Sequence, residues 1–206
     1  MNRLIIIGAS GHGKVVADLA KRCGYQEIFF LDRNPEVKSC AGYPVLGSDM
    51  MAPEIPGDVF VAIGNNAIRK AIMDSLKERE FPVLVHPSAV VAEDVEIGPG
   101  SCVMANSVLN PGAAVGKGCI VNTASSVDHD CVLSDYVHVS VGAHLCGTVC
   151  VGESTWIGAG AVVSNNVSVC GNCVIGAGAV VVKDIENAGT YVGVPARVTS
   201  GKQREQ

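Results

Sequence analysis

The second half of the chain carries an aliphatic residue at every sixth position, and this repeat constrains the fold more than any other feature. From Val85 to Val181 every sixth residue, seventeen in all, is Val, Ile or Leu. The residue two positions before each of them is always Ala, Ser, Cys, Thr or Val. A six-residue period of this length is typical of a solenoid of parallel strands with one inward aliphatic side chain per strand. Since three such hexads make one coil, the repeat predicts between five and six coils.

Glycine directly follows the inward aliphatic residue at five places: Gly98, Gly116, Gly152, Gly158 and Gly176. We expect glycine there to relax the backbone limits at a corner between two flat faces. The usual rule for parallel crossovers predicts a right-handed coil. An ordinary β-sandwich would not hold one register over so many repeats.

Basic residues are unevenly distributed, and this predicts a domain boundary. Residues 1–84 contain ten of the fifteen Lys and Arg residues, whereas Lys117 is the only one from Val85 to Val182. We therefore expect one domain over residues 1–84 and a second over residues 85–206.

The first domain alternates short apolar runs with helical spacing. Leu4–Ile7, Ile28–Leu31 and Val59–Ile63 are strand-sized apolar runs, and each ends near Gly or Asp. Apolar residues at helical spacing follow the first and third of these runs. The pattern predicts a small α/β domain with a parallel sheet, similar to a Rossmann fold.

Composition argues against several classes of partner. A net charge of −5 and only nine aromatic residues argue against nucleic-acid binding. No apolar run approaches the length of a membrane-spanning helix, and the N-terminus lacks the pattern of a signal peptide. The nine cysteines show no disulfide spacing. We therefore expect a cytoplasmic chain with reduced thiols and no membrane insertion.

A glycine-rich turn, residues 8–14, lies between the first expected strand and the first expected helix. Its backbone amides and the helix N-terminus form a candidate anion site. The turn nearly matches a phosphate-binding loop, but Val15 stands where that motif needs Ser or Thr. Its glycine spacing also differs from that of dinucleotide oxidoreductases, and a purely structural turn remains an alternative. Asp32 closes the second strand, where an acid commonly binds ribose hydroxyls.

Several segments together resemble a known bacterial family, the UDP-4-amino-sugar N-acetyltransferases and sialic acid O-acetyltransferases. These segments are GASGHG at 8–13, AIGNN at 62–66, NTASS at 122–126, DHDC at 128–131, HVSVG at 138–142 and VGVPA at 192–196. The resemblance covers almost the whole chain. It implies a left-handed parallel β-helix as an exception to the handedness rule, a homotrimer, and acetyl-CoA as the acetyl donor without a metal.

Acyl transfer to an amine needs a base, and His129 is the candidate. Asp128 and Asp130 flank it, and a carboxylate beside an imidazole raises its basicity. From the residues alone, a solvated corner of mixed charge is an equal alternative. The resemblance implies that His129 is the general base and that Asp130 orients it.

Two cysteine-based alternatives are weaker. Cys131 suggests an acyl-enzyme mechanism, but its hexad phase predicts an inward side chain, as for Cys119 and Cys173. Cys170 and Cys173 have a metal-like spacing, yet they occupy different hexad phases and no cysteine stands one coil away from either. We therefore expect direct transfer and no zinc site.

The resemblance also implies the binding residues. The N-terminal domain is expected to hold the nucleotide portion of the acceptor through Gly8, Ser10, Gly11, His12, Gly13, Asp32, Arg33, Gly64 and Asn65. The acetyl-CoA site is expected between neighbouring β-helices, at Gly147, Ala159 and Ala177, and at His138, which is expected to hold the pantetheine or the acceptor amine. Basic residues reappear after a long stretch almost without positive charge, and some of them are candidates for the CoA phosphates, with a solvated tail as an equal alternative: Lys183, Arg197, Lys202 and Arg204.

The remaining histidines and the lone tryptophan have weaker assignments. His144 shares the hexad phase of His138 but is expected on an adjacent face, and His86 is expected to be structural. Trp156 follows His138 by three hexads, so we expect it one coil further along, at the cofactor groove.

The sequence therefore predicts an acetyl-CoA-dependent N-acetyltransferase that acts on the 4-amino group of a UDP-linked sugar. Two alternatives stay open. One is an O-acetyltransferase acting on sialic acid or a related sugar, and the other is a non-catalytic trimeric scaffold.

Overall fold

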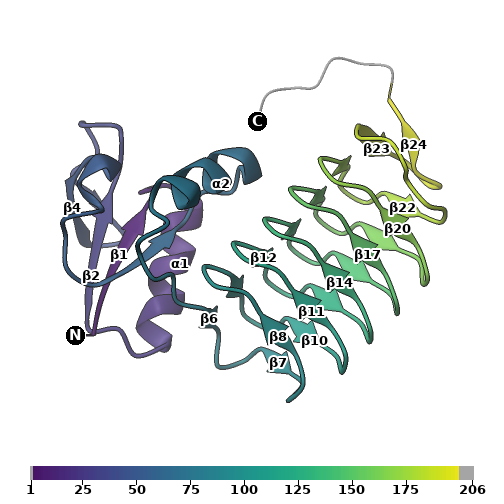
Figure 1. Cartoon of the computed structure of the whole chain (residues 1–206), viewed down its shortest axis with the longest axis horizontal. Coiled ribbons are helices and arrows are strands. Elements are labelled where there is room, and N and C mark those ends of the chain that lie inside the picture. Colours follow the sequence, from purple (N-terminus) through teal and green to yellow (C-terminus); the bar gives the residue numbers. More distant parts are fainter. Residues whose placement is uncertain (1, 200–206) are drawn as a thin grey trace.

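Five strands form the N-terminal sheet in the computed structural model, which describes residues 2–199 (Figure 1). Their order is β3–β4–β2–β1–β5, and all neighbours are parallel except β3 and β4. The bounds are β1 Arg3–Ile7, β2 Glu27–Leu31, β3 Ser39–Cys40, β4 Tyr43–Gly47 and β5 Asp58–Val61. Helices α1 (Gly11–Arg22) and α2 (Asn66–Ser75) and the short 3-10 helix η1 (Asp49–Met51) complete the domain. The predicted parallel α/β domain is confirmed, while β3, β4 and η1 were not expected.

Two-residue strands then wind into a parallel β-helix with three faces. Face 1 contains β6 (Leu84–Val85), β9 (Cys102–Val103), β12 (Ile120–Val121), β15 (His138–Val139), β18 (Trp156–Ile157), β21 (Val174–Ile175), β23 (Thr190–Val192) and β24 (Arg197–Val198). Face 2 contains β7 (Val90–Val91), β10 (Val108–Leu109), β13 (Ser126–Val127), β16 (His144–Leu145), β19 (Val162–Val163) and β22 (Val180–Val181). Face 3 contains β8 (Glu96–Ile97), β11 (Ala114–Val115), β14 (Val132–Leu133), β17 (Cys150–Val151) and β20 (Ser168–Val169).

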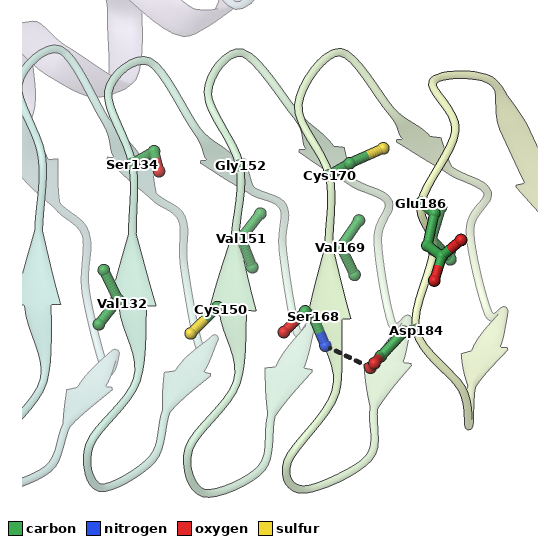
Figure 2. A pocket seen from close by; sticks show the side chains of 11 residues that line it. Val132, Ser134, Cys150, Val151, Gly152, Ser168, Val169, Cys170, Asp184 and Glu186 are labelled. Atoms are coloured by element: carbon green, nitrogen blue, oxygen red, sulfur yellow. Dashed lines mark hydrogen bonds between the residues drawn. The ribbon is translucent and has the colours of Figure 1, made fainter.

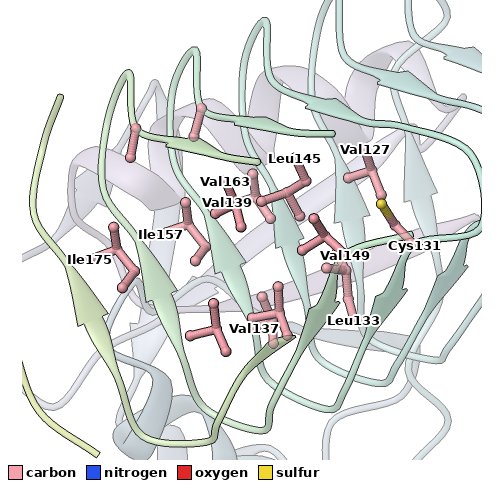
Figure 3. Close-up of a cluster of buried hydrophobic side chains, with 14 of the residues drawn as sticks. Val127, Cys131, Leu133, Val137, Val139, Leu145, Val149, Ile157, Val163 and Ile175 are labelled. Carbon is pink, nitrogen blue, oxygen red and sulfur yellow. The ribbon is translucent and has the colours of Figure 1, made fainter. Parts of the chain in front are cut away.

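Neighbouring strands within a face of the repeat are three hexads apart, as the sequence predicts. Val121, for example, pairs with Val103 on one side and with Val139 on the other. In strands β6 to β22 the second residue points inward, and these side chains fill one continuous core (Figure 3). Cys119, Cys131 and Cys173 are buried, which confirms the inward position predicted from their phase.

The role predicted for the five corner glycines is wrong. Left-handed backbone occurs at another position, three residues before the inward aliphatic, as at Gly112 (φ 76°), Asp130 (φ 57°) and Thr148 (φ 63°). Gly98 and Gly158 have no such φ. Instead, a Cβ at either position would lie 2.5 Å from backbone atoms of the next coil. Glycine is needed there because successive coils approach closely, not because the turn requires it.

The N-terminal domain packs on face 1 of the β-helix. Leu84, Cys102, Met104 and Ile120 belong to the same buried cluster as residues of β1, β2 and α1. Faces 2 and 3 are not covered by this domain (Figure 1). All nine cysteines lie within residues 2–199 and are free thiols. No helix in this part of the chain is long and apolar enough to span a membrane.

Candidate active site

His129 lies on the corner between faces 2 and 3, two residues after the end of strand β13. Asp128 fixes the start of this corner, because one of its carboxylate oxygens (Oδ1) accepts hydrogen bonds from the backbone N–H of His129 (2.8 Å) and from Nδ2 of Asn110 (2.7 Å). These bonds hold the pKa of Asp128 below its usual value. The corner therefore presents the imidazole outward from a braced backbone.

The imidazole of His129 pairs with the carboxylate of the following residue. Its Nδ1 lies 2.8 Å from Oδ2 of Asp130, and both side chains are more than half exposed. This hydrogen bond is the main cause that raises the pKa of His129, and the charge of Asp128 adds to it. With Nδ1–H donating to the carboxylate, Nε2 is left as the proton acceptor. The structure thus brings together the two residues that the sequence predicted for proton transfer.

Gly147 lies beneath this imidazole, one coil further along. A Cβ at Gly147 would collide with Nε2 of His129, and its other near neighbours are atoms of the same ring. The residue was predicted as an acetyl-CoA contact. The imidazole of His129 occupies the space where a side chain at this position would stand.

Replacing Asp130 by Asn is expected to shift the acid limb of the pH profile of kcat/KM to lower pH. The carboxylate stabilises the imidazolium, so its loss lowers the pKa of His129 and keeps the base neutral in more acidic solution. The ionisation of the acceptor amine is common to both enzymes and cancels in the comparison. The maximal rate should also fall, since the ring loses its orienting partner. An acid limb that stays in place, or moves to higher pH, would show that Asp130 does not tune the base.

In the glycine-rich turn, two glycines are required by close packing and a third has open space beside it. Gly8 has φ 108°, and a Cβ there would meet Ile63 and the carbonyl of Ala62. A Cβ at Gly13 would strike the carbonyl oxygen of Gly8, so these two glycines serve the close packing of α1 on the sheet. Gly11, in contrast, has nothing within 4 Å of such an atom. The open side of the turn is therefore at Gly11, in the first turn of α1.

Asp32 contacts this turn directly. Its Oδ2 accepts a hydrogen bond from the backbone N–H of Ala9 (2.7 Å), and its Oδ1 accepts one from Asn34 (2.8 Å). Ser10 caps α1 without a side-chain hydrogen bond to the helix. Arg33 forms an ion pair of 2.6 Å with the buried carboxylate of Asp49. Asp32 is thus placed at the turn, whereas Arg33 is tied to η1.

A second loop, residues 63–66, leads into α2, whose first residue is Asn66. Asn65 caps this helix by accepting a hydrogen bond from the backbone N–H of Ile68 (3.0 Å). Gly64 has open space where a side chain would stand. These predicted acceptor-binding residues follow β5, which is adjacent to β1 in the sheet, so both loops emerge from neighbouring parallel strands.

His12 of the glycine-rich turn faces His138 of the β-helix. Their ring centroids are 6.5 Å apart, and His138 stacks on Trp156 with centroids 5.3 Å apart and planes 8° from parallel. Nε2 of His138 lies 3.1 Å from Nδ2 of Asn122. Burial is the main cause that lowers the pKa of His12 to about 4 and that of His138 to about 3, so both rings are neutral at neutral pH. Trp156 lies one coil beyond His138, as its spacing predicted.

This cluster groups His138 with the residues predicted for the acceptor. It lies on face 1 beside the N-terminal domain, while the other predicted acetyl-CoA residues lie elsewhere. Nε2 of His12 is buried and has no hydrogen-bond partner in the described part of the chain. Asn122 is a polar neighbour that the sequence analysis did not single out, although the segment containing it was among the motifs.

The other predicted acetyl-CoA residues occupy two regions. Ala159 and Ala177 are exposed, one coil apart, on the corner between faces 1 and 2. Lys183 and Arg197 both line a cavity of about 380 Å³ at the C-terminal end of the β-helix. Lys202 and Arg204 lie outside the described residues.

The other histidines, and the cysteines at 131, 170 and 173, have different surroundings. His144 is exposed on face 2, where its Nδ1 is 2.8 Å from the hydroxyl of Ser126. His86 accepts a hydrogen bond from the backbone N–H of Ser88. Cys131 points into the core, and burial raises the pKa of its thiol. The sulfurs of Cys170 and Cys173 are 3.4 Å apart.

A further hollow of about 370 Å³ opens on face 3 (Figure 2). Val132, Cys150 and Ser168 stand on successive strands across it, and the backbone N–H of Ser168 donates to Asp184 (2.8 Å). None of the residues predicted for catalysis or binding lines this hollow. Within residues 2–199, no three His, Cys, Asp or Glu side chains are grouped closely enough to hold a metal ion.

Comparison with known proteins gives the same two-part architecture. The family model of the PglD N-terminal domain matches residues 3–76. A UDP-N-acetylbacillosamine N-acetyltransferase from Bacillus subtilis is 34% identical over 112 residues, or 50% of this chain and 52% of that protein. The match therefore spans about half the length of that relative.

Solved structures match over nearly the whole chain. The acetyltransferase domain of PglB from Neisseria gonorrhoeae is 43% identical with a TM-score of 0.93, covering 97% of this chain and 100% of that one. The same domain in complex with acetyl coenzyme A is 44% identical with a TM-score of 0.93, covering 96% and 99%. A variant of perosamine N-acetyltransferase from Caulobacter crescentus, in complex with CoA and GDP-perosamine, is 34% identical with a TM-score of 0.91, covering 96% and 97%. This chain therefore belongs to the bacterial family of sugar N-acetyltransferases that join a PglD-type N-terminal domain to a parallel β-helix.

Proposed function

We propose that this protein transfers the acetyl group of acetyl-CoA to the 4-amino group of a UDP-linked amino sugar. The observation that carries the proposal is the exposed His129–Asp130 pair, whose free Nε2 faces the coil position occupied by Gly147. Similarity to proteins described as bacillosamine and perosamine N-acetyltransferases, one solved with CoA and GDP-perosamine, supports the substrate class.

The chemistry is direct transfer. The acceptor nitrogen attacks the thioester carbonyl of acetyl-CoA while Nε2 of His129 takes its proton. The bond between carbon and sulfur then breaks, and CoA leaves with the proton returned to its sulfur. Asp130 stabilises the imidazolium formed in between. Cys131 takes no part, since its thiol is buried in the core.

Acetyl-CoA, the acetyl donor, does not need a wide pocket to bind this chain. The exposed Ala159 and Ala177 leave space for a thin pantetheine arm, while Gly147 leaves space for the imidazole of His129. A cavity at the end of the β-helix holds Lys183 and Arg197, whose charges suit the CoA phosphates.

A second copy of the chain completes the site. The N-terminal domain lies on face 1, whereas His129 lies on the opposite corner, between faces 2 and 3. A sugar held at the glycine-rich turn of one chain therefore meets the base of a neighbouring chain, as in a homotrimer.

Mixing two inactive variants is expected to restore activity. Subunits carrying His129→Ala lack the base, and subunits carrying His12→Ala have a damaged acceptor site. When the two are unfolded and refolded together, some interfaces combine an intact base with an intact acceptor site. The check is the acetyl-transfer rate of the mixture against each variant refolded alone. A mixture no more active than its parts would place both groups in one subunit.

Acceptor assays test the function itself. Release of the CoA thiol is followed with UDP-linked 4-amino sugars, GDP-linked 4-amino sugars and sialic acid. The proposal predicts the highest kcat/KM with a UDP-linked amine. Preference for sialic acid would establish the O-acetyltransferase alternative, and no turnover with any acceptor would favour the scaffold.

A further inference from the structure

Three backbone carbonyl groups on one corner of the β-helix accept hydrogen bonds from side chains of the N-terminal domain. Gly118, Tyr136 and Ser154 occupy the same position in three successive coils, between faces 3 and 1, with φ of 61°, 60° and 59°. The first two carbonyls accept hydrogen bonds from Arg69, at 2.7 Å from Nε and 3.0 Å from Nη2. The third accepts one from Nδ2 of Asn66 at 3.0 Å. The start of α2 is therefore fixed to three coils at once.

The rest of the Arg69 guanidinium binds the loop that precedes α2. Nη1 donates to the carbonyls of Ile63 (2.8 Å) and Gly64 (3.2 Å), and Nη2 donates to Oδ1 of Asn66 (2.9 Å). An arginine side chain has five N–H donors, and all five are used here. A guanidinium can be buried when each of its N–H donors has an acceptor, and Arg69 is only 1% exposed.

The charge of Arg69 has no carboxylate partner among these acceptors, which are four carbonyls and one side-chain amide. Burial lowers its pKa to about 10, so it stays protonated at neutral pH. After burial itself, the charge of Arg69 is the next cause that lowers the pKa of both His12 and His138. The Arg69 guanidinium thus holds the loop of residues 63–66 and also favours the neutral form of the His12 and His138 imidazoles.

We propose that Arg69 is a positioning residue for the acceptor, holding the loop of residues 63–66 against the three-coil corner. The inference rests on the proposed function, because that function makes Gly64 and Asn65 part of the nucleotide-sugar site. Arg69 does not touch the reacting atoms. It acts through the loop and through the protonation state of His12 and His138.

Arg79 offers a matched control. Its guanidinium also binds a set of backbone carbonyls, those of Ala52, Pro53, Ile55 and Gly57. All four carbonyls belong to the N-terminal domain, and none belongs to the acceptor loop or to the β-helix. Replacing Arg79 therefore removes a comparable set of hydrogen bonds without disturbing the proposed contact.

The test compares Arg69→Met, Arg69→Lys and Arg79→Met. Arg69→Met is expected to lower kcat/KM for the acceptor at least about tenfold while the KM for acetyl-CoA stays unchanged, because loop misplacement affects only the sugar. By NMR titration, the imidazole pKa values of His12 and His138 should rise. Arg69→Lys keeps the charge but has three donors, so it should weaken acceptor kinetics with little change in either histidine pKa. Arg79→Met should change neither the acceptor kinetics nor the histidine titrations, whatever its Tm.

Two results would overturn the inference: unchanged acceptor kinetics in both Arg69 variants, or the same kinetic loss in Arg79→Met. Arg69→Lys retains the buried cation, so it serves as the test if Arg69→Met does not fold. Should the wild-type protein acetylate no nucleotide sugar, the proposed function fails. UDP binding, measured by calorimetry, then decides the inference. Arg69→Lys should bind UDP more weakly than the wild type and Arg79→Met do. Equal UDP affinity in all three proteins would overturn the inference.

Discussion

Replacing His129 by alanine is expected to lower kcat for acetyl transfer by about 10²- to 10⁴-fold, the usual contribution of a positioned base. The imidazole is exposed, and within residues 2–199 the one hydrogen bond of its ring is to the adjacent Asp130. Its removal should therefore leave the thermal midpoint close to that of the wild type. The measurement is steady-state kinetics beside a thermal melt of the same preparation.

His144→Ala is the matched control for this experiment. His144 is also an exposed histidine on the β-helix, and its ring is bonded to the Ser126 hydroxyl rather than to a carboxylate. This variant should retain wild-type kcat. If His129→Ala acetylates at the wild-type rate, or if both variants lose activity equally, His129 is not the base.

Replacing Gly147 by alanine is expected to reduce kcat by about 10²-fold without unfolding the protein, since a small misplacement of a catalytic group is enough for such a loss. The new methyl group would collide with the imidazole of His129. Its three nearest atoms all belong to this ring, and none of them is a backbone atom. The ring is exposed and can swing outward, so the fold is spared while the base is displaced. Kinetics and a thermal melt again separate the two effects.

Gly158→Ala provides the opposite pattern. A Cβ there would lie 2.5 Å from the carbonyl oxygen of Ile175, which is backbone and cannot move aside. This variant should lower Tm, because neighbouring coils are forced apart. Should Gly147→Ala instead lower Tm and leave kcat intact, the glycine would be a packing residue of the coil and not a space kept for the base.

The β-helix and the contact between His129 and Asp130 were predictable because both depend on local sequence. A period of six fixes which side chains point inward, and the pairing of Val121 with Val103 and Val139 follows from stacking equal positions. His129 and Asp130 are adjacent in the chain, so their contact needs no knowledge of the tertiary fold. Even so, the resemblance to a family was required to prefer a base over a solvated corner.

The interdomain contacts were not predictable, because they join residues far apart in sequence. Arg69 stands in an amphipathic helix where a basic residue normally faces solvent, and nothing local indicates that it will be buried against Gly118 and Tyr136. The meeting of His12 with His138 has the same origin. The five glycines that directly follow an inward aliphatic residue were also only partly predictable. Their positions are evident from the repeat, but only the short distance between successive coils explains why a side chain is excluded there.

Tandem mass spectrometry of the reaction product determines whether an acetyl group is transferred and to which atom. The protein is incubated with acetyl-CoA and a panel of UDP-linked 4-amino sugars, and the product ions are fragmented to locate the new group. We expect a single acetyl group on the nitrogen at carbon 4, formed by the wild type and not detectably by His129→Ala. An acetyl group found on oxygen, or no acetylated nucleotide sugar from any member of the panel, would contradict this expectation.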